Sequence, residues 1–236
     1  MALGRVDAVL LDAFGTLVAL DPPAPRLRAE LAARGIDVGA ERAAAAFRAE
    51  IAYYLEHQLE GRDAAALDDL RDRCADVLRE ALGLPGLDRP SAREALLAAI
   101  RFRPYSDAAP ALRELRRRGL RLVVASNWDC SLASALRNAG LLDMVDGVVS
   151  SAEAGVRKPD PRLFERALEL AGCPPERAVH VGDSLSNDVA GAAAAGIRAV
   201  LLRRGEERPD AVAADASSDA APVTAIASLA ELARVL

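Results

Sequence analysis

The chain has 236 residues, of which 52% are hydrophobic and 28% charged, so it can bury the core of one large domain or of a domain with an insert. Charges and glycines break its apolar runs well before the ~18 residues that a membrane span needs, and Asp7 and Asp12 interrupt the only stretch that could serve as a secretory signal. We therefore expect a cytoplasmic protein with no membrane partner. Because 35 acidic residues outnumber 30 basic ones, nucleic acid is a poor candidate partner, and the three cysteines are too widely spaced for a zinc site or a disulfide framework.

Strands alternate with helices over residues 104–236. We expect strands at 5–11, 120–125, 147–150, 178–181 and 199–202, and helices at 107–118 (capped by Ser106 or Asp107), 132–139, 161–171, 187–195 and 229–236. This alternation is typical of a parallel sheet with helices on both faces, to which the isolated first strand also belongs. The sequence therefore predicts an α/β fold with a doubly wound, Rossmann-like parallel sheet as its core.

The long segment between the first strand and residue 104 has the composition of helices. Alanine, leucine, arginine and glutamate dominate residues 22–102, interrupted by glycines and a Leu-Pro-Gly break, and we expect no strand there. The predicted α/β core consists of residues 1–18 and 104–236, and residues 19–103 form an inserted all-α domain. We expect the alanine-, serine- and aspartate-rich segment 210–222 to be a surface loop.

Polar residues follow three of the predicted strands, at the carboxyl ends where open α/β sheets bind their ligands. They are Asp12, Ser126 with Asn127, and Asp183. Asp12 is followed by Gly15, which lets the backbone approach a ligand closely, and by the hydroxyl of Thr16. Asp12 can therefore attack a substrate or bind a metal ion.

Two further features indicate a metal and a phosphate. Asp183 and Asp188 lie five residues apart at a strand-to-helix junction, so both can bind one hard cation, for which Mg²⁺ is the natural choice. Lys158 is the only lysine beside 29 arginines, and its compact ammonium fits between several oxygens where a planar guanidinium would not. Each residue alone could be a turn former or a helix cap, but four segments converge on one edge of the sheet.

With Asp12, Ser126, Lys158 and Asp183 as its four motifs, the chain resembles the haloacid dehalogenase superfamily over nearly its whole length. The helical insert looks like the small cap of that family, and the phrases Ala-Ser-Asn-Trp-Asp at 125–129 and Arg-Lys-Pro-Asp-Pro at 157–161 are part of the resemblance. The resemblance implies a covalent mechanism in which the aspartate attacks the substrate and water hydrolyses the aspartyl intermediate. The expected catalytic residues are Asp12, Thr16, Ser126, Asn127 and Lys158.

Phe14 departs from the phosphatases of this family, which carry at that position an aspartate that protonates the leaving oxygen and then activates water. Phenylalanine cannot transfer a proton, although its backbone carbonyl could still bind the metal. An aromatic residue followed by Gly-Thr is similar to the 2-haloacid dehalogenase branch, in which the leaving halide needs no proton and no metal is used. This resemblance makes Phe14 a candidate substrate-binding residue.

The predicted cap contains a second feature of the dehalogenase type. Phe47-Arg48 followed by Tyr53-Tyr54 resembles the aromatic and arginine set with which those enzymes bind substrate and halide, so Arg48 is another candidate substrate-binding residue. The helical spacing of Phe47, Ile51 and Tyr54 favours the alternative that they form the cap core while Arg48 is solvated.

The fourth motif favours a phosphatase. Haloacid dehalogenases carry serine and asparagine here, whereas Gly182-Asp183 with Asn187-Asp188 resembles the magnesium-binding form, and Asp183 would repel Asp12 by several kcal/mol without a cation between them. We predict Mg²⁺ bound by Asp12, the Phe14 carbonyl, Asp183 and Asp188. The predicted function is a magnesium-dependent phosphatase of a small phosphorylated metabolite, with an impaired acid/base step. The alternatives are a 2-haloacid dehalogenase and a non-catalytic, regulatory metal- or phosphate-binding protein.

Two other residues have simpler interpretations. His180 lies inside an apolar strand and is expected to belong to the core, and Trp128 is expected to pack under the cap. If alkyl and aryl phosphates are cleaved at similar rates, another group must supply the proton, and Asp129, three residues past Ser126, is the first candidate. The expected partner is a small-molecule substrate, and the sequence specifies no oligomeric state.

Overall fold

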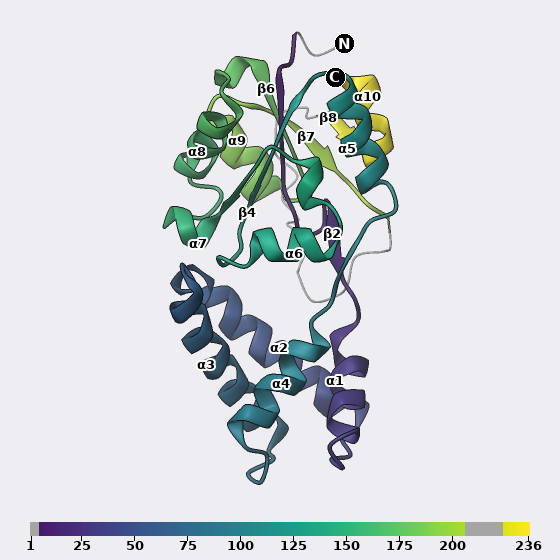
Figure 1. The fold of residues 1–236 in the computed structure, drawn as a ribbon, viewed down its shortest axis with the longest axis vertical. Helices are drawn as coiled ribbons and strands as arrows, with labels where there is room; N and C mark the ends of the chain where they lie inside the picture. Colours follow the sequence, from purple (N-terminus) through teal and green to yellow (C-terminus); the bar gives the residue numbers. More distant parts are fainter. Residues whose placement is uncertain (1–4, 206–223) are drawn as a thin grey trace.

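Six parallel strands form the main sheet of the computed structural model, which describes residues 5–205 and 224–236 (Figure 1). The strands are β1 (Ala8–Leu11), β4 (Arg121–Ser126), β5 (Gly147–Ser150), β6 (Ala178–Gly182), β7 (Arg198–Leu202) and β8 (Thr224–Ile226). Their order is β5-β4-β1-β6-β7-β8, so the chain builds outward from β1 in both directions. This doubly wound order places the ligand crevice beyond the carboxyl ends of β4, β1 and β6.

Helices cover both faces of the sheet, which explains why its strands are apolar runs without polar alternation. Val9 and Leu11 of β1 pack in one cluster with residues of α5 (Ala108–Arg117), α6 (Leu132–Asn138) and α10 (Leu232–Val235). Ala8 and Leu10 point to the other face and pack with residues of α8 (Pro161–Ala171) and α9 (Ala190–Ala194). The predicted Rossmann-like α/β core is confirmed.

A layer of four helices lies at the end of the molecule toward which the carboxyl end of β1 points (Figure 1). They are α1 (Pro23–Ala32), α2 (Ala40–His57), α3 (Ala64–Leu82) and α4 (Arg89–Ala99). Their buried residues form a separate apolar cluster that includes Leu31, Phe47, Leu70 and Leu96. A two-stranded antiparallel sheet, β2 (Val18–Leu20) with β3 (Phe102–Pro104), carries the chain into this layer and back. We propose that residues 19–103 form the cap.

Local sequence signals fix several helix ends. The Asp63 side chain accepts a hydrogen bond of 2.9 Å from the backbone N–H of Ala66 at the start of α3. Gly83 ends that helix at φ +58°, a left-handed conformation that favours glycine. Asp160 caps α8 in the same manner, and Pro161 follows it in the first helical turn.

Several expected elements differ in the structure. The segment 22–102 was expected to contain no strand, but β3 begins at Phe102, and the short elements β2, β8 and α7 (Ser151–Ala154) were not predicted. Asp107 precedes α5 without a side-chain cap bond and binds Arg204 instead. Segment 210–222 lies outside the described residues.

The described residues also contain short helical turns: η1 (Gln58–Glu60), η2 (Leu142–Met144), η3 (Pro175–Arg177), η4 (Leu185–Val189) and η5 (Leu229–Glu231). None of the described helices is both long and apolar enough to span a bilayer.

Candidate active site

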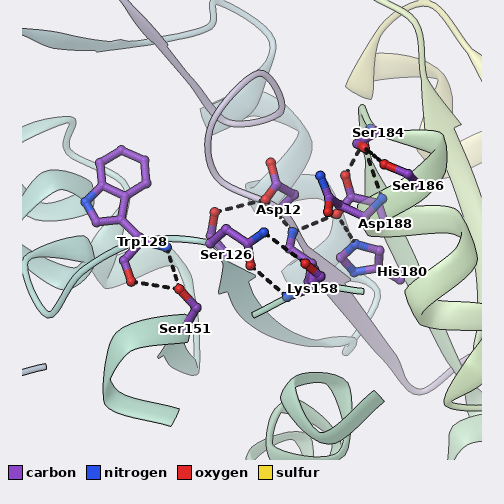
Figure 2. Close-up of polar contacts among 11 residues, drawn as sticks. Asp12, Ser126, Trp128, Ser151, Lys158, His180, Ser184, Ser186 and Asp188 are labelled. Atoms are coloured by element: carbon purple, nitrogen blue, oxygen red, sulfur yellow. Dashed lines mark hydrogen bonds and ion pairs between the residues drawn. The ribbon is translucent and has the colours of Figure 1, made fainter. Parts of the chain in front are cut away.

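Parallel pairing brings the predicted residues to one edge of the sheet. Leu11, the last residue of β1, is in register with Val124 of β4 and with Val181 of β6. Asp12 and Ser126 therefore lie at neighbouring strand ends, and Figure 2 shows them together with Lys158 and Asp188.

Asp12 receives two hydrogen bonds on the same carboxylate oxygen. Ser126 Oγ donates to Asp12 Oδ1 at 2.9 Å, and Lys158 Nζ donates to it at 2.5 Å. The residue is only 5% exposed, so burial raises the pKa of its carboxyl; Lys158 opposes that shift and Asp188 adds to it. Two donors on Oδ1 hold the side chain in one orientation.

Lys158 joins Asp12 to Asp188. Its Nζ lies 2.6 Å from Asp188 Oδ1, and the lysine side chain is 2% exposed. Burial acts to lower the pKa of Lys158, but the carboxylates of Asp12 and Asp188 raise it above its ordinary value, so the side chain is an ammonium ion. For Asp188, burial acts to raise the pKa of the carboxyl. The charge of Lys158 and a hydrogen bond from His180 outweigh that effect and hold this pKa below its ordinary value.

Asp183 completes a cluster of carboxylates. One oxygen each of Asp12, Asp183 and Asp188 lie within 4.8 Å of one another, close enough to share a single cation. Gly15 has φ +81°, and a Cβ at this position would lie 2.1 Å from Asp183 Oδ2. Gly15, three residues after Asp12, has no side chain and therefore leaves the space that the Asp183 carboxylate occupies.

Asp188 belongs to a turn of π-helix, η4, rather than to the regular helix expected from residue 187. Its Oδ2 accepts a hydrogen bond of 3.0 Å from the backbone N–H of Ser184. The side chain also lies against β6, because a Cβ on Gly182 would be 2.2 Å from Asp188 Cγ. Backbone and glycine together set the position of this carboxylate.

The Asn127 side chain forms hydrogen bonds with the backbone of Lys158. Its Oδ1 accepts a 2.8 Å hydrogen bond from the backbone N–H of Lys158, and its Nδ2 donates to the carbonyl oxygen of Lys158 at 3.2 Å. This two-point contact fixes the backbone from which the Lys158 side chain extends.

The remaining predicted residues lie in different surroundings. The Thr16 hydroxyl is buried and has no hydrogen-bond partner among the described residues, so it is not bonded to Asp12. Phe14 is partly buried and packs against both the core and the cap clusters, with its ring 6.3 Å from that of Phe102. Arg48 is exposed on α2, whereas Phe47 is buried in the cap cluster.

Arg204 is a residue of the site region that the sequence reasoning missed. Its guanidinium donates to the carbonyl oxygens of Gly15 at 3.2 Å and Thr16 at 2.7 Å, pairs with Asp107 at 2.9 Å, and stacks 3.7 Å from the centre of the Tyr105 ring. It thereby fixes the turn that follows Asp12. The rule of collecting residues beyond strand ends, applied to β7, would have found it.

Asp129, the second candidate proton donor, connects the core to the cap layer. Its Oδ2 accepts a 2.9 Å hydrogen bond from the Tyr54 hydroxyl, and its Oδ1 accepts one of 2.7 Å from the backbone N–H of Ser131. Burial and the charge of Asp129 raise the pKa of Tyr54 well above its ordinary value, so the phenol keeps its proton. Both Asp129 oxygens are thus engaged. Trp128, expected under the cap, is buried with its ring 4.7 Å from that of Phe102.

Comparison with known proteins agrees with this geometry. A family model for haloacid dehalogenase-like hydrolases matches residues 6–196. The chain belongs to this family. The haloacid dehalogenase-like hydrolase described here is 42% identical over 139 residues to a phosphoserine phosphatase of Thermus thermophilus, covering 58% of this chain and 56% of that protein. It is 40% identical over 106 residues to a glyceraldehyde 3-phosphate phosphatase of Methanopyrus kandleri, covering 44% of this chain and 46% of that protein. The hydrolase thus spans about half the length of these curated relatives.

Solved structures resemble this hydrolase over almost its whole length. L-2-haloacid dehalogenase from Xanthobacter autotrophicus is 25% identical, with a TM-score of 0.70 and coverage of 98% of each chain. A haloacid dehalogenase-family phosphatase from Thermococcus onnurineus is 26% identical, with a TM-score of 0.62 and coverage of 98% of this chain and 97% of the other. The fold is therefore common to both branches, and the side chains at the site must distinguish them.

Proposed function

We propose that this hydrolase is a magnesium-dependent phosphatase that acts on a small phosphorylated metabolite through a covalent intermediate on Asp12. The observation that carries the proposal is the approach of Asp183 to Asp12 and Asp188, with one oxygen of each within 4.8 Å. Three carboxylates at this separation repel one another strongly, and Lys158 offsets one of their charges.

The donor set fits a magnesium ion. Carboxylate oxygens are hard ligands of the kind that Mg²⁺ prefers, and the ion is bound through a few carboxylates together with substrate phosphate. Asp12, Asp183 and Asp188 would hold it, with the Phe14 carbonyl as a further ligand that we propose from the family resemblance. When bound, the ion would supply positive charge for the phosphoryl oxygens.

Asp12 is oriented for nucleophilic attack. Because Ser126 and Lys158 both donate to Oδ1, the other oxygen, Oδ2, is the atom we assign to attack phosphorus. An Asp12–phosphate bond forms as the bond from phosphorus to the leaving oxygen breaks, and that oxygen departs with the electron pair. Water then hydrolyses the acyl phosphate, which releases phosphate and restores the carboxylate. Lys158 offsets negative charge throughout.

The leaving group receives little help in this scheme. Phe14 occupies the place of the family acid, and Asp129, the other candidate proton donor, already accepts hydrogen bonds from Tyr54 and Ser131. We therefore propose that the enzyme prefers phosphates whose leaving group is stable as an anion, such as phenolates or carboxylates. The phosphatase names of its relatives support the reaction class.

A 2-haloacid dehalogenase is the second candidate, because Phe14 is an aromatic residue where phosphatases have an acid and because a structural neighbour carries that name. Halide leaves without a proton, so Phe14 suits that reaction as well. Asp183 opposes this alternative, since a third carboxylate beside Asp12 would repel an anionic haloacid as well as Asp12 itself.

A turnover screen separates the candidates. Phosphomonoesters, acyl phosphates and 2-haloacids would each be offered to the protein with Mg²⁺ and with a chelator. We expect phosphate release that requires Mg²⁺. Halide release that persists in chelator would establish the dehalogenase instead, and turnover of neither class would indicate a binding protein.

A further inference from the structure

His180 of β6 contacts the carboxylate cluster through Asp188. Its side chain is fully buried, and its Nε2 is 2.9 Å from Asp188 Oδ1 (Figure 2). The ring packs edge-on against Phe164 of α8 at 5.0 Å between ring centres. The sequence pattern predicts a core histidine, and its burial agrees, but apolar packing alone does not account for the contact with Asp188.

The surroundings of the ring determine which nitrogen carries the proton. Asp188 Oδ1 is an acceptor, so Nε2 must donate, while Nδ1 is buried without a hydrogen-bond partner among the described residues. An imidazole nitrogen that carries a proton is a hydrogen-bond donor, and the carboxylate oxygen opposite Nε2 can only accept. His180 therefore provides Asp188 with one N–H donor, on Nε2.

The contacts of Asp188 divide between its two oxygens. Oδ1 accepts from Lys158 Nζ at 2.6 Å and from His180 Nε2 at 2.9 Å, which uses both of its lone pairs. Oδ2 accepts from the backbone N–H of Ser184 at 3.0 Å, and among the contacts of the described residues this leaves it one lone pair. Oδ2 is therefore the Asp188 oxygen that can take a further ligand.

We propose that His180 is a positioning residue that fixes the orientation of the Asp188 carboxylate. In this orientation Oδ1 accepts the hydrogen bond from Lys158, and Oδ2 is the oxygen that would bind the magnesium ion. The inference rests on the proposed magnesium-dependent function. Without the imidazole donor, Oδ1 keeps an unused lone pair, and the carboxylate can turn and present either oxygen to the cation while loosening its contact with Lys158. Residues that hold metal ligands in this way contribute about 10- to 100-fold to metal affinity or activity.

The test compares His180→Leu with His180→Gln. Leucine removes the donor, whereas the glutamine amide retains an N–H that can reach Asp188. Mg²⁺ binding would be measured by titration calorimetry on each full-length protein, with thermal unfolding without metal as the measure of structural damage. Val179→Ala is the matched control, because Val179 is the adjacent buried residue of β6 and packs on the opposite face of the sheet.

We expect His180→Leu to weaken Mg²⁺ binding about 10- to 100-fold and His180→Gln to recover most of that loss. Val179→Ala should lower the unfolding temperature with native Mg²⁺ affinity. Native affinity in His180→Leu, or equal losses in the leucine and glutamine variants, would overturn the positioning role while the metal site itself stands. An absence of Mg²⁺ binding in the unmodified protein would instead refute the proposed metal site, and this inference with it.

Discussion

Lys158 contacts two carboxylates at once, with its Nζ 2.5 Å from Asp12 Oδ1 and 2.6 Å from Asp188 Oδ1. A guanidinium is wider and planar, and a site whose side chain is 2% exposed has no room for it. We expect Lys158→Arg to reduce turnover by more than about 100-fold, the range seen when one charge-stabilising donor is lost. Steady-state kinetics with p-nitrophenyl phosphate would measure this. The neighbouring Arg157 is exposed, so Arg157→Lys serves as the control, and native turnover in Lys158→Arg would refute the compact-charge argument.

Under the proposed function, Asp183 is the residue that distinguishes a metal-dependent site from a dehalogenase site. Because its oxygen lies within 4.8 Å of those of Asp12 and Asp188, we expect Asp183→Asn to abolish measurable Mg²⁺ binding in titration calorimetry at pH 7.5. Asp143→Asn, an exposed substitution on η2, should bind Mg²⁺ like the unmodified protein. Equal affinity in the unmodified and Asp183→Asn proteins would remove Asp183 from the metal site.

Under the proposed function, Phe14 determines which leaving groups the enzyme tolerates. General acid catalysis is worth about 10²- to 10⁴-fold, so aryl and acyl phosphates should be cleaved faster than alkyl phosphates by a factor in that range. Phe14→Asp restores a carboxylate two residues after Asp12. This variant should show a smaller ratio of kcat/KM for aryl phosphates to kcat/KM for alkyl phosphates. Phe14→Leu, which removes the ring and adds no acid, should leave this ratio large. Similar rates on alkyl and aryl phosphates in the unmodified enzyme would mean that another group supplies the proton.

At the scale of elements, helix α2 contains a buried acid in the cap layer. Glu50 is 4% exposed, and burial raises its pKa to about 7, although a hydrogen bond with Cys74 opposes the shift. The folded state therefore binds this proton more tightly than the unfolded chain does, so the free energy of unfolding falls as pH rises from about 4.5 through 7. Between pH 5 and pH 8 the loss attributable to Glu50 is roughly 2 to 3 kcal/mol.

Glu50→Gln removes this titration. We expect the variant to unfold with nearly the same free energy as the unmodified protein at pH 5, and to be more stable by roughly 2 kcal/mol at pH 8, as measured by urea denaturation. Glu56→Gln, an exposed substitution on the same helix, should change neither value. Parallel pH dependences for the unmodified protein and Glu50→Gln would show that Glu50 is not the responsible group.

Elements with strong local signals could be predicted from the sequence, and elements formed by distant pairing could not. Helix α8 was predicted with its observed bounds because Asp160 caps it, Pro161 starts it and Gly172 ends it. Strands β2 and β3 are three residues each, and their pairing joins segments about eighty residues apart, which no local periodicity reveals. The carboxyl-end rule found Asp12, Ser126 and Asp183 because strand ends are local features. The roles of His180 and Arg204 depend on contacts that only the folded chain creates.

At the scale of the whole molecule, contacts between distant segments hold the site together. Arg204 and Asp107 connect the end of β7 and the start of α5 to the turn after Asp12. On the cap side, the Tyr54 hydroxyl bonds to Asp129, and the backbone N–H of Cys130 donates to the carbonyl oxygen of Gly61 at 2.9 Å. The helical layer thus meets the core immediately after the Ser126 strand end.

We propose that a phosphoryl group is transferred from the substrate to Asp12 and then to water in a reaction that requires magnesium. Mass spectrometry of the protein, quenched rapidly during turnover of p-nitrophenyl phosphate, tests it most directly. We expect a mass increase of one phosphoryl group on the peptide that contains Asp12, present with Mg²⁺ and absent in chelator and in Asp12→Asn. Phosphate release without that adduct, or an adduct formed instead from a 2-haloacid in chelator, would contradict it.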